Sequence, residues 1–593
     1  MKVADERESG KRRGKLDGQV IRWILSLLRP HWRATAVCGA LLLSSSLFTL
    51  AGPLLVRRAI DVDFANRDFH GLLLTAALYL AMLIAGMTAG YSQTVLLEKI
   101  GQRIIQTLRV DLFSRLITLS PAFFSRNPVG QLLSRVESDT ESLRTVFTTT
   151  VITILTNIIT LAGMIGVMVS ISPRLSLVLF ATVVPGFIAA RLYNRRVMPL
   201  FHDVRQKTAE VYAFLEERIR GVLVVQAFGR EAAAVSQMDD INRQKMEVEY
   251  PAERLANYFG HSVMFLSTMA TAGALWLGGR WALAGGLTVG TLVMFLNYIT
   301  QFFGPFFHLA EQLGSIQRAV AGAARIRSLL GQTSDIVSPA QPVPWRRLTE
   351  SIEFRGVWHA YQNEEWVLRD VSFRVPVGQR WALVGATGGG KSSIISLLLR
   401  FYDPARGQIF FDAINIRDLE LSALRAAVSL VLQDTVLFPM SILENIRLED
   451  PRISEEQVWR ALEVIGADEF VRRLPDGIGY ELREGGRNLS MGERQLLSFA
   501  RALVFDPQIL ILDEATAAVD PLAERQIQRA MNALLTGRTS LLIAHRLLTI
   551  QDCDNILVID NGQIVEQGTH QKLLELGGRY AHLHLAQTGN HRR

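Results

Sequence analysis

Six long apolar segments within the first 310 residues constrain the fold of this chain more than any other feature. Each is long enough to cross the ~30 Å hydrocarbon core of a bilayer as a helix, and none carries a charge at its centre. The segments are 34–56, 72–97, 146–171, 174–197, 256–283 and 287–310. We therefore expect an all-α transmembrane domain of six helices.

The connections between these segments predict their orientation. The connections after the second and fourth segments are long, roughly 50 to 60 residues, and strongly charged with helical periodicity, whereas those after the third and fifth are short. Lys and Arg crowd the first 33 residues, and basic flanks stay in the cytoplasm. The N-terminus and both long connections are thus expected to be cytoplasmic. Each connection would continue two spans as helices that reverse near Pro121–Pro128 and near Val222–Arg230.

The composition changes sharply after the last apolar segment. Three prolines follow Ser338, which no helix would tolerate, so 331–350 is interpreted as a linker. It separates a basic tail with an interfacial helix (1–33) and a transmembrane domain (34–330) from a second domain (351–593). In that domain, short β-type runs and helix patterns alternate to the end, which predicts an α/β fold.

Charge and cysteine content narrow the possible partners. The chain has 63 Lys and Arg against 56 Asp and Glu, a net charge of +7 that would suit nucleic acid or an anionic membrane surface. The basic residues just before the first apolar segment favour membrane lipids, and no nucleic-acid partner is expected. The two cysteines, Cys38 and Cys553, lie in different halves of the chain, so no structural disulfide is expected.

The strongest chemical signal is a glycine-rich loop between an apolar strand at 382–384 and a helix expected at 393–399. It matches the phosphate-loop pattern G-x-x-x-x-G-K-[ST] in the strand–loop–helix context that this pattern requires. Backbone N–H groups of such a loop surround phosphates, the lysine reaches the β- and γ-phosphates, and the serine binds Mg²⁺. The predicted ATP-binding residues of the loop are Gly385, Ala386, Thr387, Gly388, Gly389, Gly390, Lys391, Ser392 and Ser393.

Two carboxylates follow a second buried strand at 509–512. Asp513 is expected to hold Mg²⁺ together with Ser392, and Glu514 to act as the general base that polarises the attacking water. ATP and Mg²⁺ are therefore the expected cofactors.

These elements resemble the ABC transporter family, and further residues match its motifs in order over about 200 residues. The resemblance implies that Tyr361 stacks on adenine, that Gln433 reaches Mg²⁺, and that Ser490 and Gly492 of the signature motif contact ATP. It also implies a D-loop role for Asp520 and a catalytic contact of His545 with the γ-phosphate. Segments 119–135 and 221–230 resemble the coupling regions of exporter-type half-transporters, so the resemblance covers essentially the whole chain beyond the tail.

The signature motif departs from the family pattern Leu-Ser-Gly-Gly-Gln. Met491 replaces the first glycine and Glu493 replaces the glutamine, while Glu514 and His545 are intact. This combination resembles one subunit of a heterodimeric exporter, whose partner has a good signature and lacks the glutamate. A homodimer with a tolerated variation is the alternative.

The resemblance implies ATP-driven export of amphiphilic or drug-like solutes by alternating access, from a bacterial inner membrane. A lipid flippase, and an ATP-gated channel or regulator, are the alternatives. Polar residues within the third and sixth segments and phenylalanines near Pro305 could line a substrate cavity, or could serve helix–helix packing instead. These residues are Thr153, Asn157, Thr160, Asn297, Thr300, Gln301, Phe302, Phe303, Phe306 and Phe307.

Overall fold

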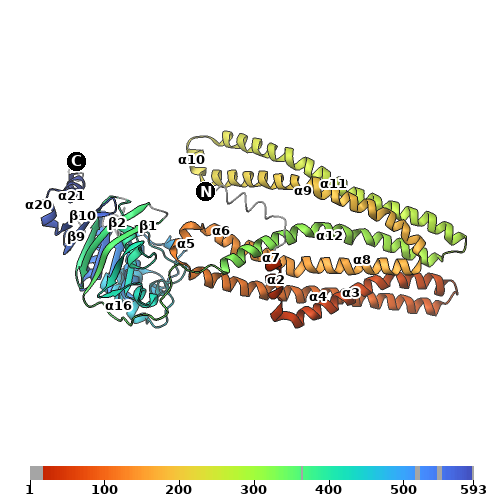
Figure 1. Cartoon of the computed structure of the whole chain (residues 1–593), viewed down its shortest axis with the longest axis horizontal. Coiled ribbons are helices and arrows are strands. Elements are labelled where there is room, and N and C mark those ends of the chain that lie inside the picture. Colours follow the sequence, from red (N-terminus) through yellow and green to blue (C-terminus); the bar gives the residue numbers. More distant parts are fainter. Residues whose placement is uncertain (1–17, 362–364, 387, 514–520, 544–549, 590–593) are drawn as a thin grey trace. The chain divides into compact units, whose positions relative to one another are not determined.

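The computed structural model describes residues 18–361, 365–386, 388–513, 521–543 and 550–589. The chain forms two compact units, and each is described by itself. The membrane unit comprises 1–117 and 129–332, and the nucleotide unit comprises 118–128 and 333–593. Figure 1 shows the first as long helices and the second as sheets covered by shorter helices.

Long helices form the membrane unit, as the apolar segments predict. Five helical stretches within the described residues are long and apolar enough to cross a membrane. All but the first two residues of the sixth predicted segment (287–310) lie in α12, a helix of 42 residues that is not among those five. The count of six spans therefore stays a prediction. The principal helices are α2 (Gly18–Ser26), α3 (Trp32–Arg58), α4 (Phe69–Ile117), α8 (Val151–Ile171), α9 (Pro173–Arg220), α11 (Glu231–Leu283) and α12 (Val289–Leu330).

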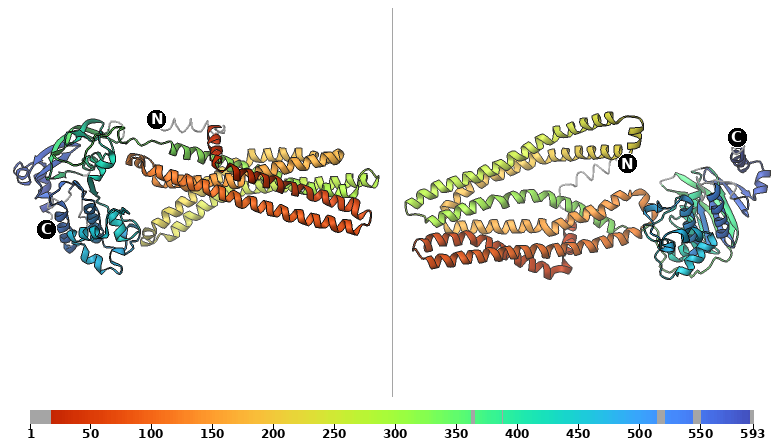
Figure 2. Two further views of the ribbon diagram at one scale, coloured as in Figure 1. Left: turned by 90° about the horizontal axis from the view of Figure 1, so that it is seen from below. Right: turned by 180° about the vertical axis from the view of Figure 1, so that it is seen from behind.

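The predicted helical extensions and reversals are confirmed. Helices α4, α9 and α11 have 49, 48 and 53 residues, far more than the roughly 20 that a bilayer requires. The chain reverses through the short helices α5 (Pro121–Arg126) and α10 (Val222–Ala227). Figures 1 and 2 show α9 and α11 side by side, and α12 packs on α3 and α8. Between α5 and α8 the chain forms α6 (Val129–Ser134), α7 (Thr140–Thr145) and single π-helical turns.

Four of the ten polar and aromatic residues proposed to line a substrate cavity are buried between helices. Asn157 and Thr160 of α8 are 8% and 6% exposed. Phe302 and Phe303 of α12 lie in the core between helices. For these four residues the packing alternative is confirmed, because a side chain enclosed by neighbouring helices cannot also face a cavity. The side chains of Phe306 and Phe307 lie outside the described residues.

The nucleotide unit contains two sheets, which confirms the α/β prediction. A four-stranded antiparallel sheet has the order β2-β1-β4-β5. A six-stranded sheet has the order β10-β9-β3-β8-β7-β6, and only β10 is antiparallel to its neighbour. The strands are β1 (Ser351–Ala360), β2 (Trp366–Pro376), β3 (Arg380–Val384), β4 (Arg406–Phe411), β5 (Ile414–Asn415), β6 (Val428–Val431), β7 (Ile509–Asp513), β8 (Thr539–Ile543), β9 (Asn555–Asp560) and β10 (Gln563–Gly568).

Both faces of the six-stranded sheet are buried, which explains its continuous apolar strands. Alternate side chains of a strand point to opposite faces. In β7, Ile509 and Ile511 belong to the core shared with the antiparallel sheet, whereas Leu510 and Leu512 belong to the core shared with helices. The helices of this unit are α13 (Lys391–Leu398), α14 (Leu421–Ala426), α15 (Ile442–Arg447), α16 (Glu455–Ile465), α17 (Asp468–Arg473), α18 (Met491–Val504), α19 (Pro521–Leu535), α20 (His570–Glu575) and α21 (Arg579–Gly589).

Candidate nucleotide-binding site

The predicted site residues follow neighbouring parallel strands at one edge of the six-stranded sheet. Strands β3, β8, β7 and β6 are adjacent in that order and parallel, so their carboxyl ends meet at the same edge. The phosphate loop follows β3, Asp513 ends β7, and Gln433 comes two residues after β6. Ligands of open α/β sheets bind outside the carboxyl ends of the strands. The sheet order therefore brings together three motifs that lie up to 128 residues apart in the chain (385 to 513).

The phosphate loop requires glycine where its backbone approaches other chain segments. Gly385 has φ +154° and Gly390 has φ +107°, backbone angles that residues other than glycine rarely adopt. A Cβ at Gly385 would collide with the carbonyl oxygen of Ile559, and one at Gly390 would lie 2.6 Å from Leu368 Cδ2. The following helix, α13, begins at Lys391, two residues earlier than expected, because the lysine and serine of the motif form its first turn.

The position of Lys391 fits a nucleotide phosphate. Its side chain is only 5% exposed, and its Nζ donates to the carbonyl oxygens of Gly385 (2.8 Å) and Ala386 (2.9 Å). These contacts hold the ammonium of Lys391 at the phosphate loop, where the lysine of this motif reaches the β- and γ-phosphates. Ser392 is exposed at the N-terminus of α13, where the helix dipole favours an anion. The donor set therefore matches the expected cofactor ATP.

Tyr361 lies beside the phosphate loop, as its predicted contact with the nucleotide requires. Its hydroxyl is 2.9 Å from Ser393 Oγ, and its ring is 39% exposed. The ring meets those of His359 and Tyr402 edge to face, with centroids 4.8 and 5.1 Å away. An exposed aromatic ring that is fixed by contacts with neighbouring rings is suited to stacking on a base.

The structure describes only some of the other residues predicted at this edge of the sheet. Asp513 is half-buried and Gln433 is exposed. Thr387, Glu514, Asp520 and His545 lie outside the described residues.

The signature motif forms the start of α18. Ser490 caps this helix: its Oγ accepts from the backbone N–H of Glu493 (3.3 Å), and its own N–H donates to the Glu493 carboxylate (2.8 Å). A glutamine would make the same reciprocal bonds. Gly492 is buried and the Met491 side chain is 39% exposed. In the described part of the chain, no hydrogen bond joins Ser490 or Gly492 to the phosphate loop.

Sequence reasoning missed two residues that support this site. Arg501 of α18 donates to the carbonyl oxygens of Asn445 (2.8 Å) and Val436 (2.9 Å), and burial lowers the pKa of its guanidinium. Asn445 is 1% exposed and bonds the backbone of Phe438 through both side-chain atoms. They tie the signature helix to the loop that follows Gln433. No local pattern marks these contacts, because the two residues are 56 positions apart.

Comparison with known proteins agrees with this geometry. The profile of the ABC transporter transmembrane region matches residues 35–306, and the ABC transporter profile of the nucleotide domain matches 368–517. A probable multidrug resistance ABC transporter ATP-binding/permease protein of Bacillus subtilis is 35% identical over 89% of this chain and 78% of its own length. The chain belongs to the ABC transporter family.

Two further relatives of the transporter cover nearly its whole length. The ATP-dependent lipid A-core flippase of Syntrophus aciditrophicus is 32% identical over 96% of this chain and 94% of its own length. The solved structure of a bacterial Atm1-family ABC exporter with ATP bound superposes with a TM-score of 0.77 at 29% identity, over 95% of this chain and 99% of that one. The transporter is therefore an integral membrane protein of the exporter type that binds and hydrolyses ATP and works as a dimer.

Proposed function

We propose that this transporter exports amphiphilic or drug-like solutes by alternating access, powered by ATP at the sheet edge described above. The observation that carries the proposal is the buried Lys391 in a phosphate loop whose backbone requires glycine at Gly385 and Gly390. The apolar helices of the membrane unit supply the pathway. A lipid flippase is the second candidate, because the relative in Syntrophus aciditrophicus is one. An ATP-gated channel or regulator on the same scaffold is the third alternative, which no observation favours.

The residues of the sheet edge divide the chemistry between them. Lys391 compensates the charge of the β- and γ-phosphates, and Tyr361 carries the adenine. Ser392, Gln433 and Asp513 would hold Mg²⁺, which takes few protein ligands besides phosphate oxygens and water. When bound, this ion neutralises charge on the phosphates.

Glu514 is the proposed general base. It is the next residue in the sequence after Asp513, which ends β7 at the edge where the phosphate loop begins. Its carboxylate accepts a proton from the attacking water, and His545 contacts the γ-phosphate. Asp520, Ser490 and Gly492 are assigned to the contact between the two chains of the dimer.

A heterodimer is the proposed assembly. Each signature motif would close over ATP on the partner's phosphate loop, and the bulk of Met491 would weaken the site that this chain's signature completes. ATP drives the change of conformation only if it binds the closed dimer better than the open one. We further propose six spans per chain, with the N-terminus and the nucleotide unit in the cytoplasm of a bacterial cell and the spans in its inner membrane.

Substitution of Glu514 by Gln tests the proposed function. We expect the Glu514→Gln transporter in proteoliposomes to bind ATP as the wild type does, while turnover falls about 10²-fold or more, because the amide cannot accept the proton. ATPase rate and binding of a fluorescent ATP analogue are measured in parallel.

Glu456→Gln, an exposed change in α16, is the matched control and should leave both quantities unchanged. Full turnover in the Glu514→Gln protein would refute the assignment of the base.

A further inference from the structure

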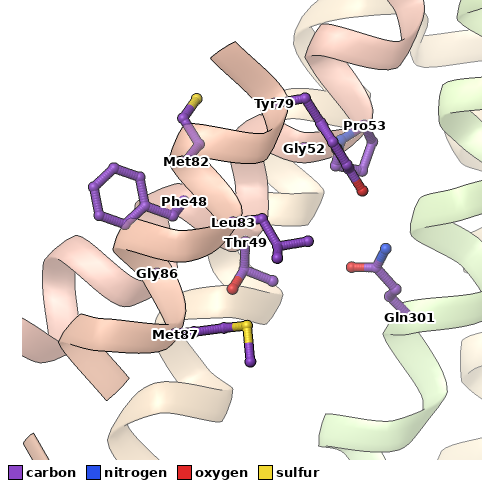
Figure 3. Close-up of a pocket in the computed structure, with 10 residues that line it drawn as sticks. All are labelled: Phe48, Thr49, Gly52, Pro53, Tyr79, Met82, Leu83, Gly86, Met87 and Gln301. Atoms are coloured by element: carbon purple, nitrogen blue, oxygen red, sulfur yellow. The ribbon is translucent and has the colours of Figure 1, made fainter. Parts of the chain in front are cut away.

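An open cavity of about 370 Å³ lies between α3, α4 and α12 of the membrane unit (Figure 3), and its lining residues Leu83 and Met87 are 45% and 69% exposed. Its volume falls within the range of small-molecule sites. Phe48 of α3 and Leu83 and Met87 of α4 supply apolar wall, and methionine adapts to ligands of varied shape. None of its ten lining residues, all in the described part of the chain, is acidic, basic or a histidine.

Two hydrogen-bonding side chains face each other across this cavity. In Figure 3 the Gln301 amide points from α12 toward Tyr79 and Leu83 of α4. Within the described residues, neither the Gln301 amide nor the Tyr79 hydroxyl makes a hydrogen bond. The third polar residue, Thr49, is already satisfied, because its hydroxyl donates to the Ser45 carbonyl oxygen (3.0 Å).

The neighbouring polar residues of α12 differ from Gln301. Asn297 donates its amide to the Val293 carbonyl oxygen (3.0 Å), and Thr300 donates to the Asn297 carbonyl oxygen (2.9 Å). Their polar groups are thus occupied by their own helix. Of the three polar residues predicted in the sixth segment, only Gln301 lines the cavity. Its amide makes no hydrogen bond within the described residues.

Close contact between α3 and α4 sets the width of the cavity wall. A Cβ at Gly86 would lie 3.2 Å from Phe48 Cβ, and a Cβ at Gly52 would lie 3.5 Å from Tyr79 Cε2. Helices α3 and α4 are therefore closely packed at this wall of the cavity.

We propose that this cavity binds an uncharged amphiphile as substrate. Its headgroup would hydrogen-bond to Gln301 and Tyr79, and its chain would lie along Phe48 and Leu83. A charged headgroup would find no counter-charge in the lining and would keep its desolvation penalty. This inference rests on the proposed export function and specifies its substrate class as neutral rather than anionic or cationic.

Three probes with the same chain and different headgroup charge test the inference. They are monododecanoylglycerol (neutral), dodecanoate (anionic) and dodecyltrimethylammonium (cationic), offered to the purified full-length transporter in nanodiscs. Binding is measured by equilibrium dialysis, and stimulation of ATPase activity is measured separately. We expect the neutral probe to bind at least about 10-fold more tightly than either charged probe.

Two changes at Gln301 separate the amide from its surroundings. Gln301→Glu places a carboxylate at nearly the same volume, so the neutral probe should bind about 10-fold more weakly and the cationic probe more tightly. Gln301→Leu removes only the hydrogen bond and should weaken the neutral probe about 3- to 10-fold. Asn297→Asp is the matched control: it makes the same chemical change one turn away on α12, outside the cavity, and should leave the order of the probes unchanged.

The outcomes are distinct. Equal binding of the three probes, or an unchanged order in Gln301→Glu, would overturn the inference and indicate that bilayer lipid alone fills the cavity. If hydrolysis depends on Glu514 while no probe shows the expected order, the inference fails and the proposed function stands. Absence of Glu514-dependent hydrolysis in the wild type would overturn the proposed function, and dialysis, which needs no turnover, would still decide the inference.

Discussion

His359 lies in β1 beneath the rings of Tyr361 and Tyr402 and is only 3% exposed. Its Nε2 is buried with no hydrogen-bond partner in the described residues. Burial lowers the pKa of this imidazole, while a bond to the backbone of Asp403 opposes the shift. A neutral histidine therefore supports the aromatic face offered to the nucleotide.

Acidification should weaken the nucleotide unit through His359. Because burial disfavours the charged imidazole, the unfolded chain binds more protons than the folded protein, and stability falls as the pH drops below the unfolded pKa of about 6.5. We expect His359→Phe to reduce the loss of Tm between pH 7.5 and 5.5 by about 2 °C or more, measured by scanning fluorimetry of the full-length protein. His202→Gln, at a site whose side chain is 77% exposed, is the control. An identical pH response in wild type and His359→Phe would contradict this prediction.

At the scale of elements, α12 is held near both ends by aspartates from other parts of the membrane unit. Near its N-terminus, Asp61 accepts from the Gly290 N–H (2.8 Å) and from the Thr288 hydroxyl (2.6 Å). Near its C-terminus, Arg325 donates to both oxygens of Asp139, at 2.8 and 2.5 Å. A bidentate arginine–carboxylate pair fixes orientation as well as distance. These contacts set the rotation of α12, the helix that carries Gln301.

Breaking the second contact should loosen the membrane unit. Asp139 is 7% exposed, so Arg325→Ala leaves a buried carboxylate without its cation and should cost about 1–3 kcal/mol. Arg325→Lys should recover only part of this, since an ammonium cannot form two parallel bonds. The Tm in nanodiscs measures the effect, with the exposed neighbour Arg327→Ala as control. Equal Tm values for Arg325→Ala and Arg327→Ala would show that the pair contributes nothing.

At the scale of the whole molecule, the signature motif bears on the choice of partner. Because the Glu493 carboxylate is engaged in capping Ser490, as a glutamine would be, the charge of Glu493 is a weaker argument for an impaired site than the bulk of Met491. The argument for a heterodimer therefore rests mainly on Met491.

Purification from the native source should yield a second half-transporter with a different sequence. We expect that chain to have glycine where this one has Met491, and to lack a glutamate where this one has Glu514. Mass spectrometry of the intact complex in detergent measures its composition, and expression of this chain alone is the control. A complex of two identical chains with full ATPase activity would refute the heterodimer.

Sequence reasoning was most successful where a motif depends on residues adjacent in the chain. The phosphate loop joins a strand to a helix, and its glycines follow from the close approach of its own backbone to phosphate. The reversals at α5 and α10 were predicted because long charged connections cannot remain in a bilayer. The sequence could not place His359, because alternation in a strand shows that a side chain is buried and not what it touches.

The sequence by itself determined the apolar spans, the α/β class of the second domain and the order of the nucleotide motifs. Tertiary structure alone decided that Asp139 meets Arg325, 186 residues away, and that Gln301 faces a cavity while Asn157 is buried. The physical reason is that a membrane-spanning helix is apolar on every side, so periodicity does not reveal which face packs against protein. Only the packing of neighbouring helices fixes that direction.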